Sequence, residues 1–118
     1  MTEIWKPAVG YEGYEVSDHG QVRSLDRTIY RKDGQTRLCK GRALKPQKHS
    51  DGYLYVCLYR EAKPRKEYIH RLVLEAFTGP CPDGMECRHL DGNPENNRVS
   101  NLQWGTRSEN ILDVVRHG

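Results

Sequence analysis

Residues 85–110 carry three side chains whose types and spacing suit the hydrolysis of a phosphodiester bond. His89 is followed by Asn101 after twelve residues and by Asn110 after nine more. A neutral imidazole can take a proton from water, and oxygen ligands can hold a hard divalent cation that stabilises negative charge on a phosphate. The spacing therefore predicts metal-assisted cleavage with a histidine as general base.

The segment that must position these side chains is predicted to fold as strand, loop, strand and helix. A short run from residue 85 to 90 precedes the turn-forming residues 91–94, and residues 102–104 form the second strand. Thr106 or Ser108 can cap the helix, because Glu109 follows Thr106 by three residues. The apolar face of this helix would consist of Ile111, Leu112, Val114 and Val115.

Ten residues of this segment resemble the motif of the HNH endonucleases, the ββα-metal nucleases, in their homing and phage subgroup. They are His89, Asp91, Gly92, Asn93, Asn96, Asn97, Asn101, Leu102, Trp104 and Asn110. The resemblance implies that His89 is the general base, that Asn101 supports the loop and orients His89, and that Asn110 binds Mg²⁺ or Mn²⁺. It also implies cleavage to 5′-phosphate and 3′-hydroxyl ends.

One position departs from the family pattern. Many members have Asp or Asn directly before the histidine as a second metal ligand, whereas this chain has Arg88. A guanidinium group cannot ligate a cation. Either Asn110 is the only direct protein ligand or another acid substitutes, and Asp113 is a candidate because it lies one helical turn beyond Asn110. Arg88 could instead contact a phosphate oxygen.

Residues 3–25 resemble a small module that often precedes HNH nuclease cores and is thought to help hold DNA. The matching residues are Trp5, Lys6, Gly10, Tyr11, Glu12, Tyr14, Val16, Ser17, Gly20, Val22, Arg23 and Ser24. Residues 14–17 and 21–25 are predicted to form a hairpin. Trp5 is predicted to lie in the core, since a large aromatic residue of a small domain usually packs there.

Positive charge is concentrated between residues 23 and 48. This segment holds nine basic and two acidic side chains, a net charge of +7, while the remainder of the chain sums to −4. Short strands at residues 28–31, 36–38 and 42–44 would form a ribbon whose cations contact phosphates, although a solubilising surface is the alternative. The candidate DNA-binding residues are Arg23, Arg27, Arg31, Lys40, Arg42, Lys45 and Arg88.

Residues 53–77 are predicted to form a hairpin and a helix. The strand at residues 53–59 alternates aliphatic side chains, which should face the core, with tyrosines that either pack half-buried or contact nucleic acid. Residues 63–66 should form a turn and residues 67–69 the returning strand. His70 begins an amphipathic helix, and a structural role for it is favoured over contact with a phosphate or the metal cleft.

Length and composition predict a single α+β domain of 118 residues, with small antiparallel sheets and hairpins followed by a ββα finger. Within it, residues 3–25 form the N-terminal module, 26–52 the basic ribbon and 53–118 the nuclease core. No long apolar run or signal peptide is present, which predicts a cytoplasmic protein. The four cysteines lack paired metal-binding spacing, so structural zinc is not expected.

These observations predict a divalent-metal-dependent DNA endonuclease that nicks one strand or cuts both. A second reading is an HNH-like DNA-binding protein that has lost catalysis, with Arg88 as the sign of that loss. A third is a nuclease subunit that acts only with a partner, such as a phage packaging enzyme. A homodimer is a further possibility.

Overall fold

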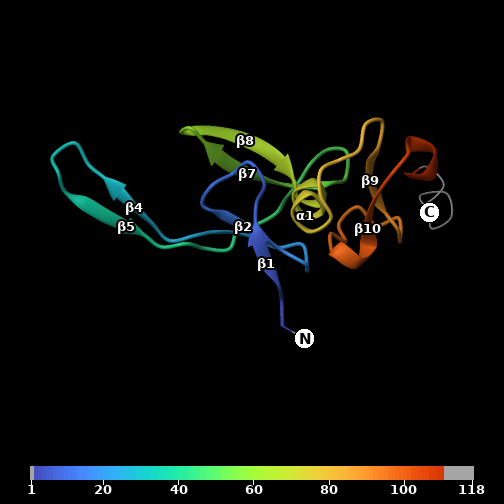
Figure 1. Cartoon of the computed structure of the whole chain (residues 1–118), viewed down its shortest axis with the longest axis horizontal. Coiled ribbons are helices and arrows are strands. Elements are labelled where there is room, and N and C mark those ends of the chain that lie inside the picture. The colour runs from blue at the N-terminus through green and yellow to red at the C-terminus, as the bar shows by residue number, and fades with distance from the viewer. Residues whose placement is uncertain (1, 111–118) are drawn as a thin grey trace.

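A computed structural model of the chain describes residues 2–110. The molecule is elongated, with extents of 58 × 32 × 25 Å. Its longer helix, α1 (Ile69–Phe77), lies near the middle, a two-stranded arm projects at one end, and a second hairpin lies at the other end (Figure 1). Among the described residues, no helix is long and apolar enough to cross a membrane.

The N-terminal residues form a three-stranded antiparallel sheet of β1 (Trp5–Pro7), β2 (Tyr14–Ser17) and β3 (Val22–Ser24). The predicted hairpin is confirmed, and its turn is fixed by Ser17, whose hydroxyl oxygen accepts hydrogen bonds from the backbone amides of His19 and Gln21. Trp5 differs from its prediction. It is only half-buried, and the Arg23 guanidinium lies 3.9 Å from the centre of its ring. The indole is therefore packed against a cation and not against the hydrophobic core.

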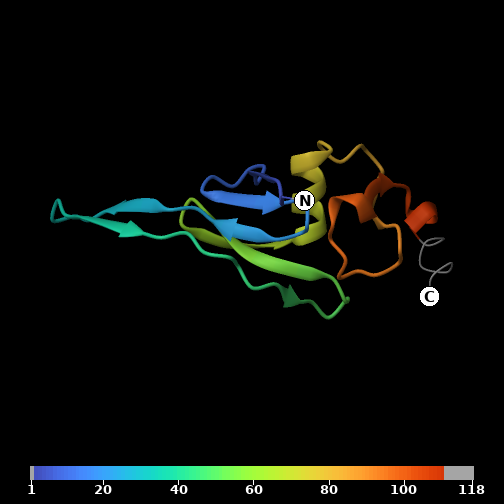
Figure 2. The same ribbon diagram turned by 90° about the horizontal axis from the view of Figure 1, so that it is seen from below.

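The basic segment forms the projecting arm. Strands β4 (Arg27–Tyr30) and β5 (Thr36–Cys39) pair antiparallel and extend away from the rest of the molecule (Figures 1 and 2). All of their residues are exposed except Cys39, which is half-buried. The third strand predicted at residues 42–44 is reduced to one isolated bridge, between Ala43 and Arg23.

A second three-stranded sheet consists of β6 (Gln47–Lys48), β7 (Leu54–Arg60) and β8 (Lys63–Tyr68), in that order. The turn predicted at residues 63–66 is wrong, because these residues are part of β8. The chain instead reverses at Glu61 and Ala62, which adopt φ values of 54° and 64°. Pro64 is accommodated because β8 is an edge strand of the sheet. The outer edge of such a strand has no neighbouring strand that needs a backbone amide donor.

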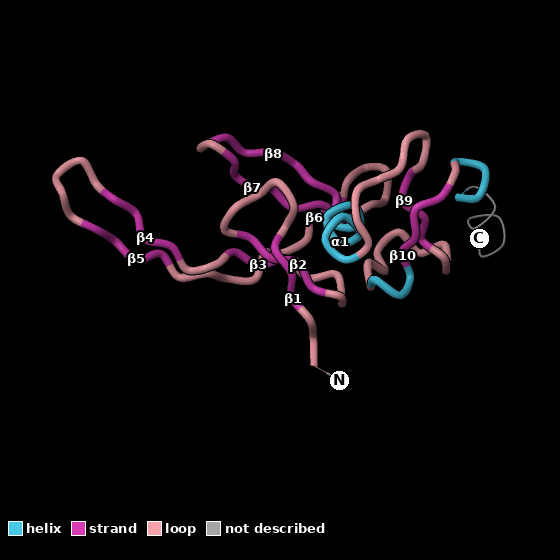
Figure 3. Tube along the Cα trace, viewed as in Figure 1, coloured by secondary structure: helices cyan, strands magenta, loops and turns pink. Residues whose placement is uncertain are grey.

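The hydrophobic core surrounds α1. The helix buries Leu72, Val73 and Leu74, and the inward face of β7 adds Val56 and Leu58, as the alternation predicted. The N-terminal sheet and the C-terminal hairpin pack against the same cluster through Val16, Val22, Cys87 and Leu102. One cluster therefore joins all three regions, which places the C-terminal hairpin firmly against the helix (Figure 3).

The C-terminal hairpin follows the predicted order of strand, loop, strand and helix. Strand β9 (Glu86–His89) pairs with β10 (Leu102–Gly105), and the 3₁₀ helix η1 (Val99–Asn101) closes the loop between them. A helix begins at residue 107. Thr106 and Glu109 form the predicted capping box: each accepts a hydrogen bond from the other's backbone amide, at 2.9 and 3.3 Å. The predicted apolar face of this helix lies outside the described residues.

Candidate active site

His89 is the last residue of β9 and is almost fully buried, with 4% of its surface exposed. Its Nε2 lies 2.9 Å from the side-chain oxygen of Asn97. In this arrangement Nε2–H donates to the amide oxygen, so the lone pair of the imidazole is on Nδ1. Burial lowers the pKa of His89, against the opposing effects of the Asn97 hydrogen bond and the Asp91 charge. The ring is therefore neutral at pH 7, as a general base must be.

Asn97 is held by the N-terminal module. The turn residue Gly20, at φ +84°, packs so closely that a Cβ there would lie 2.7 Å from the backbone oxygen of Asn97. Nearby, the amide of Val99 donates a 2.9 Å hydrogen bond to the carbonyl of Asp18. The turn between β2 and β3 thus contacts the loop at two points, Asn97 and Val99. Sequence reasoning assigned Asn97 no role beyond its place in the motif.

Asn101 holds the loop between the two strands. Its side-chain oxygen accepts from the Asp91 amide at 3.0 Å, and its nitrogen donates to the Asp91 carboxylate and to the Asn96 carbonyl, both at 2.9 Å. The direct hydrogen-bond partner of the His89 ring is Asn97, and the role of Asn101 in orienting His89 stays a prediction. Asn101 fixes the loop, and Asn97 contacts the imidazole.

Asn110 reaches the same region from the start of the C-terminal helix. Its amide nitrogen donates to the Glu86 carboxylate at 2.7 Å, and its side chain lines the same cleft as Tyr53. The Tyr53 ring centre lies 5.6 Å from that of His89. Tyr53 thus contacts the His89 ring and lines the cleft together with Asn110.

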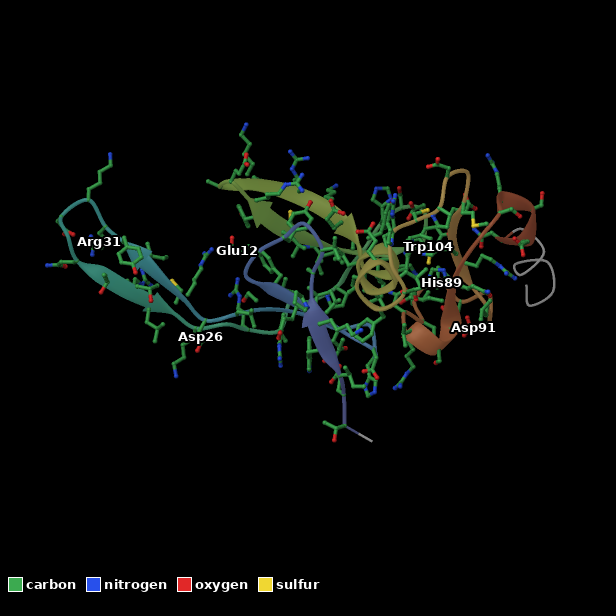
Figure 4. All side chains as sticks on the ribbon, in the orientation of Figure 1. Glu12, Asp26, Arg31, His89, Asp91 and Trp104 are labelled. Carbon is green, nitrogen blue, oxygen red and sulfur yellow. The ribbon has the colours of Figure 1, made fainter. Side chains whose placement is uncertain are left out.

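A cleft of about 260 Å³ lies next to His89, which contacts its lining residues Tyr53 and His70 without lining it itself. Its lining includes Tyr53, Tyr68, His70, Glu86, Trp104 and Asn110. Figure 4 shows His89 and Trp104 close to this region, between α1 and the C-terminal hairpin. The cleft thus gathers side chains from the second sheet, α1, both strands of the hairpin and the C-terminal helix.

His70 occupies the wall of the cleft. Its ring stacks on Tyr68 with centroids 5.2 Å apart and lies 5.1 Å from the ring of His89. Burial, and secondarily the charge of His89, lowers the pKa of His70 to about 3. Within the described residues, its Nδ1 is buried without a hydrogen-bond partner. His70 is therefore a neutral imidazole with one polar atom unsatisfied.

The Arg88 side chain passes Gly105 of β10 and reaches the start of the C-terminal helix. Its guanidinium lies 3.4 Å from the Glu109 carboxylate, and its side chain crosses Gly105, where a Cβ would lie 2.1 Å from the arginine Cδ. Only glycine leaves room for this path. Asp113, the acid expected to compensate for Arg88, lies outside the described residues.

The candidate DNA-binding cations differ in their surroundings. Arg23 is occupied, because it forms a 2.7 Å ion pair with Glu15 and stacks on Trp5. Arg27, Arg31, Lys40, Arg42 and Lys45 are exposed, and within residues 2–110 none of them forms an ion pair with a carboxylate. Arg31 lies at the far end of the arm, well away from His89 (Figure 4).

Metal-binding chemistry at the cleft rests on oxygen donors. Residues 2–110 contain no group of three or more His, Cys, Asp or Glu side chains arranged to hold an ion. Burial raises the pKa of the Cys87 thiol to about 12, so it stays protonated. The Asn110 carboxamide and the Glu86 carboxylate are hard donors of the kind that Mg²⁺ and Mn²⁺ prefer, so the residues fit such an ion.

Comparisons with known proteins agree with this arrangement. Residues 67–112 match the HNH endonuclease family, and residues 3–59 match the NUMOD4 motif. The chain carries an HNH endonuclease domain. The DNA endonuclease I-HmuI of Bacillus phage SP01 is 34% identical over 115 residues, which cover 97% of this chain and 59% of that protein. The HNH domain here is thus homologous to that of a phage DNA endonuclease.

Two further comparisons extend this result. The solved structure of the HNH homing endonuclease I-HmuI, described for DNA binding and cleavage, superimposes with a TM-score of 0.74 over 98% of this chain and 59% of that chain. A putative HNH homing endonuclease of a Bacillus subtilis strain 168 prophage is 38% identical over 68 residues, 57% of this chain and 39% of that protein. The chain spans about three fifths of the length of I-HmuI, and the α+β fold with its HNH hairpin is confirmed.

Proposed function

We propose that this chain is a DNA endonuclease that depends on Mg²⁺ or Mn²⁺ and uses His89 as its general base. The observation that carries the proposal is the neutral, buried imidazole held by Asn97 beside a cleft lined with oxygen donors. Its lone pair on Nδ1 takes the proton of the attacking water. As implied by the HNH resemblance, the products carry 5′-phosphate and 3′-hydroxyl ends.

The remaining site residues position the reacting groups. Asn97 keeps the imidazole in one tautomer, and Asn101 fixes the loop through Asp91. Asn110 would hold the cation at the cleft through its carboxamide oxygen. When bound, the cation stabilises negative charge on the phosphate and on the leaving oxygen. Arg88, whose guanidinium lies 3.4 Å from the Glu109 carboxylate, would contact a phosphate oxygen of the DNA.

DNA is held by the exposed cations of the arm and its base. A two-stranded ribbon can lie along a groove of the duplex, where lysine and arginine side chains contact phosphates without reading sequence. The exposed Arg27, Arg31, Lys40, Arg42 and Lys45 support this role. Arg23 is left to a structural one, since Glu15 and Trp5 already engage it.

Nicking of supercoiled plasmid tests the proposal. We expect the wild-type chain to convert plasmid to the open-circular form in Mg²⁺ or Mn²⁺ and not in EDTA. His89→Ala should abolish conversion while DNA affinity stays nearly unchanged. His49→Ala, which alters a half-buried histidine outside the cleft, is the matched control. Equal loss of cleavage and binding in His89→Ala would assign His89 to structure instead of catalysis.

A second candidate is a DNA-binding protein without catalysis, favoured by Arg88 at the position where the family has a metal ligand. Salt-sensitive DNA binding with no nicking in any divalent metal would support it. A nuclease subunit would instead nick only when its partner is added. The nicking assay, together with DNA binding measured at several salt concentrations, distinguishes these outcomes.

A further inference from the structure

The cleft is lined by two carboxylates that lie outside the family motif, Asp51 and Glu86. Asp51 accepts hydrogen bonds from the Tyr53 amide and the Tyr68 hydroxyl, whereas Glu86 contacts Asn110. Glu86 lies two residues before Arg88 on β9, opposite Gly105 on β10. Side chains two residues apart on a strand share a face, so Glu86 and Arg88 project from the same side of the hairpin. A long Glu86 side chain can therefore reach the space that an acid at position 88 would serve.

The contacts of Glu86 place it beside the one predicted metal ligand in the described part of the chain. Its carboxylate accepts the 2.7 Å hydrogen bond from Asn110, and its negative charge contributes to raising the pKa of Tyr53, after burial and Asp51. Glu86, Asn110 and Tyr53 all line the same cleft. A carboxylate, a carboxamide and a phenol thus converge on one spot.

A second observation at this spot indicates that the cleft is built for a ligand. His70, only 8% exposed, lines the cleft with its Nδ1 buried and without a partner among residues 2–110. A buried polar group left unsatisfied is rare in a protein interior. It is expected where an ion and its water molecules complete the hydrogen bonding.

The charge of Arg88 is balanced by a different acid, Glu109. Glu109 binds the Arg88 guanidinium at 3.4 Å while its other oxygen caps the helix through Thr106. The positive charge of Arg88 is thereby opposed by an acid other than Glu86. Glu86 keeps its own carboxylate for the cleft.

We propose that the Glu86 carboxylate and the Asn110 carboxamide bind the divalent cation. Glu86 would take the role of the metal ligand that many family members have at the position of Arg88. This inference rests on the proposed nuclease function and deepens it. Mg²⁺ is usually held by one or two protein carboxylates, with water and substrate phosphate oxygens filling its other positions. One carboxylate and one carboxamide are therefore enough for a site completed by DNA.

Direct measurement of Mn²⁺ binding tests the inference without relying on cleavage. Titration of the protein with Mn²⁺, followed by loss of the free-ion signal in electron paramagnetic resonance, gives the affinity and the number of sites. Glu86→Gln keeps an oxygen that can accept the Asn110 hydrogen bond but removes the charge. We expect it to weaken Mn²⁺ binding by at least about tenfold, the scale of losses seen around metal sites.

Two further variants make the test specific. Asp83→Asn removes an exposed carboxylate three residues away that does not line the cleft, and it should bind Mn²⁺ like the wild type. Adding Arg88→Asp to Glu86→Gln restores an acid at the family position and should recover most of the lost affinity. A Glu86→Gln affinity within twofold of wild type, or a wild-type chain that binds no Mn²⁺ at millimolar concentration, would overturn the inference.

Plasmid nicking by the same proteins separates this inference from the proposed function. If wild type and Glu86→Gln nick equally in Mn²⁺, the nuclease proposal stands and the role of Glu86 is refuted. If the wild type binds Mn²⁺ through Glu86 but nicks no plasmid, the metal site stands and the nuclease proposal fails. Loss of both Mn²⁺ binding and nicking in Glu86→Gln, with both intact in Asp83→Asn, supports the two together.

Discussion

Mild acid should destabilise this fold through His70. The folded protein holds this imidazole neutral, with a pKa of about 3, because protonation would place a charge in a buried site beside His89. In the unfolded chain the same group takes up a proton near pH 6.5. Since the folded pKa lies below the unfolded one, the stability is fully present above about pH 6.5 and is lost as the pH falls toward about 3.

The size of the effect follows from the two pKa values. Between pH 7.5 and pH 5 the unfolded state gains most of one proton at position 70 and the folded state gains almost none. The free energy of unfolding should therefore fall by about 2 kcal/mol over this interval from His70 alone. His89, whose pKa burial also lowers, adds to the loss in the same direction.

Urea unfolding at pH 7.5, 6.5 and 5 measures this directly. His70→Phe keeps an aromatic ring against Tyr68 and Tyr53 but cannot titrate, so its free energy of unfolding should fall by about 2 kcal/mol less than that of the wild type. Parallel curves for wild type and His70→Phe would refute the reasoning, because they would mean that His70 titrates alike in both states.

Three other perturbations test separate parts of the structure. Asn97→Asp places a carboxylate against His89 and should raise its pKa, so the acid limb of the pH–rate profile for nicking moves to higher pH; an unmoved limb would contradict the contact. Replacing Lys40, Arg42 and Lys45 with Gln should lower the slope of log affinity for DNA against log salt by up to about 3, and an unchanged slope would return these cations to a solubilising role. Thr106→Ala should cost about 1 kcal/mol of unfolding free energy through loss of the helix cap, measured by urea titration, whereas no change would show that the cap is dispensable.

Local signals in the sequence predicted most of the elements correctly. The Tyr14–Ser17 strand, the β7 alternation and the Thr106–Glu109 cap depend on neighbouring residues, and the structure has all three. The turn after β7 was misplaced because Pro64 resembles a turn residue, whereas the chain reverses at Glu61 and Ala62 with positive φ. Neither residue type favours that conformation, so no local signal marked the position.

The site shows where sequence reasoning stops. The motif identified the asparagines, but which of them meets His89 depends on how the loop folds back and on Gly20 from the N-terminal module. Glu86 was missed because it lies before the motif, and its approach to Asn110 requires β9 to be in register with the helix start. Such contacts between distant segments come from packing and cannot be deduced from spacing.

The arm formed by β4 and β5 contributes little to the stability of the fold. Its two strands bury almost nothing, so the free energy of folding comes from elsewhere, around α1. Changes in the length, charge or tip residues of the arm should consequently leave the rest of the protein intact. Under the proposed function, such changes would alter DNA binding by the arm and leave the surroundings of His89 unchanged.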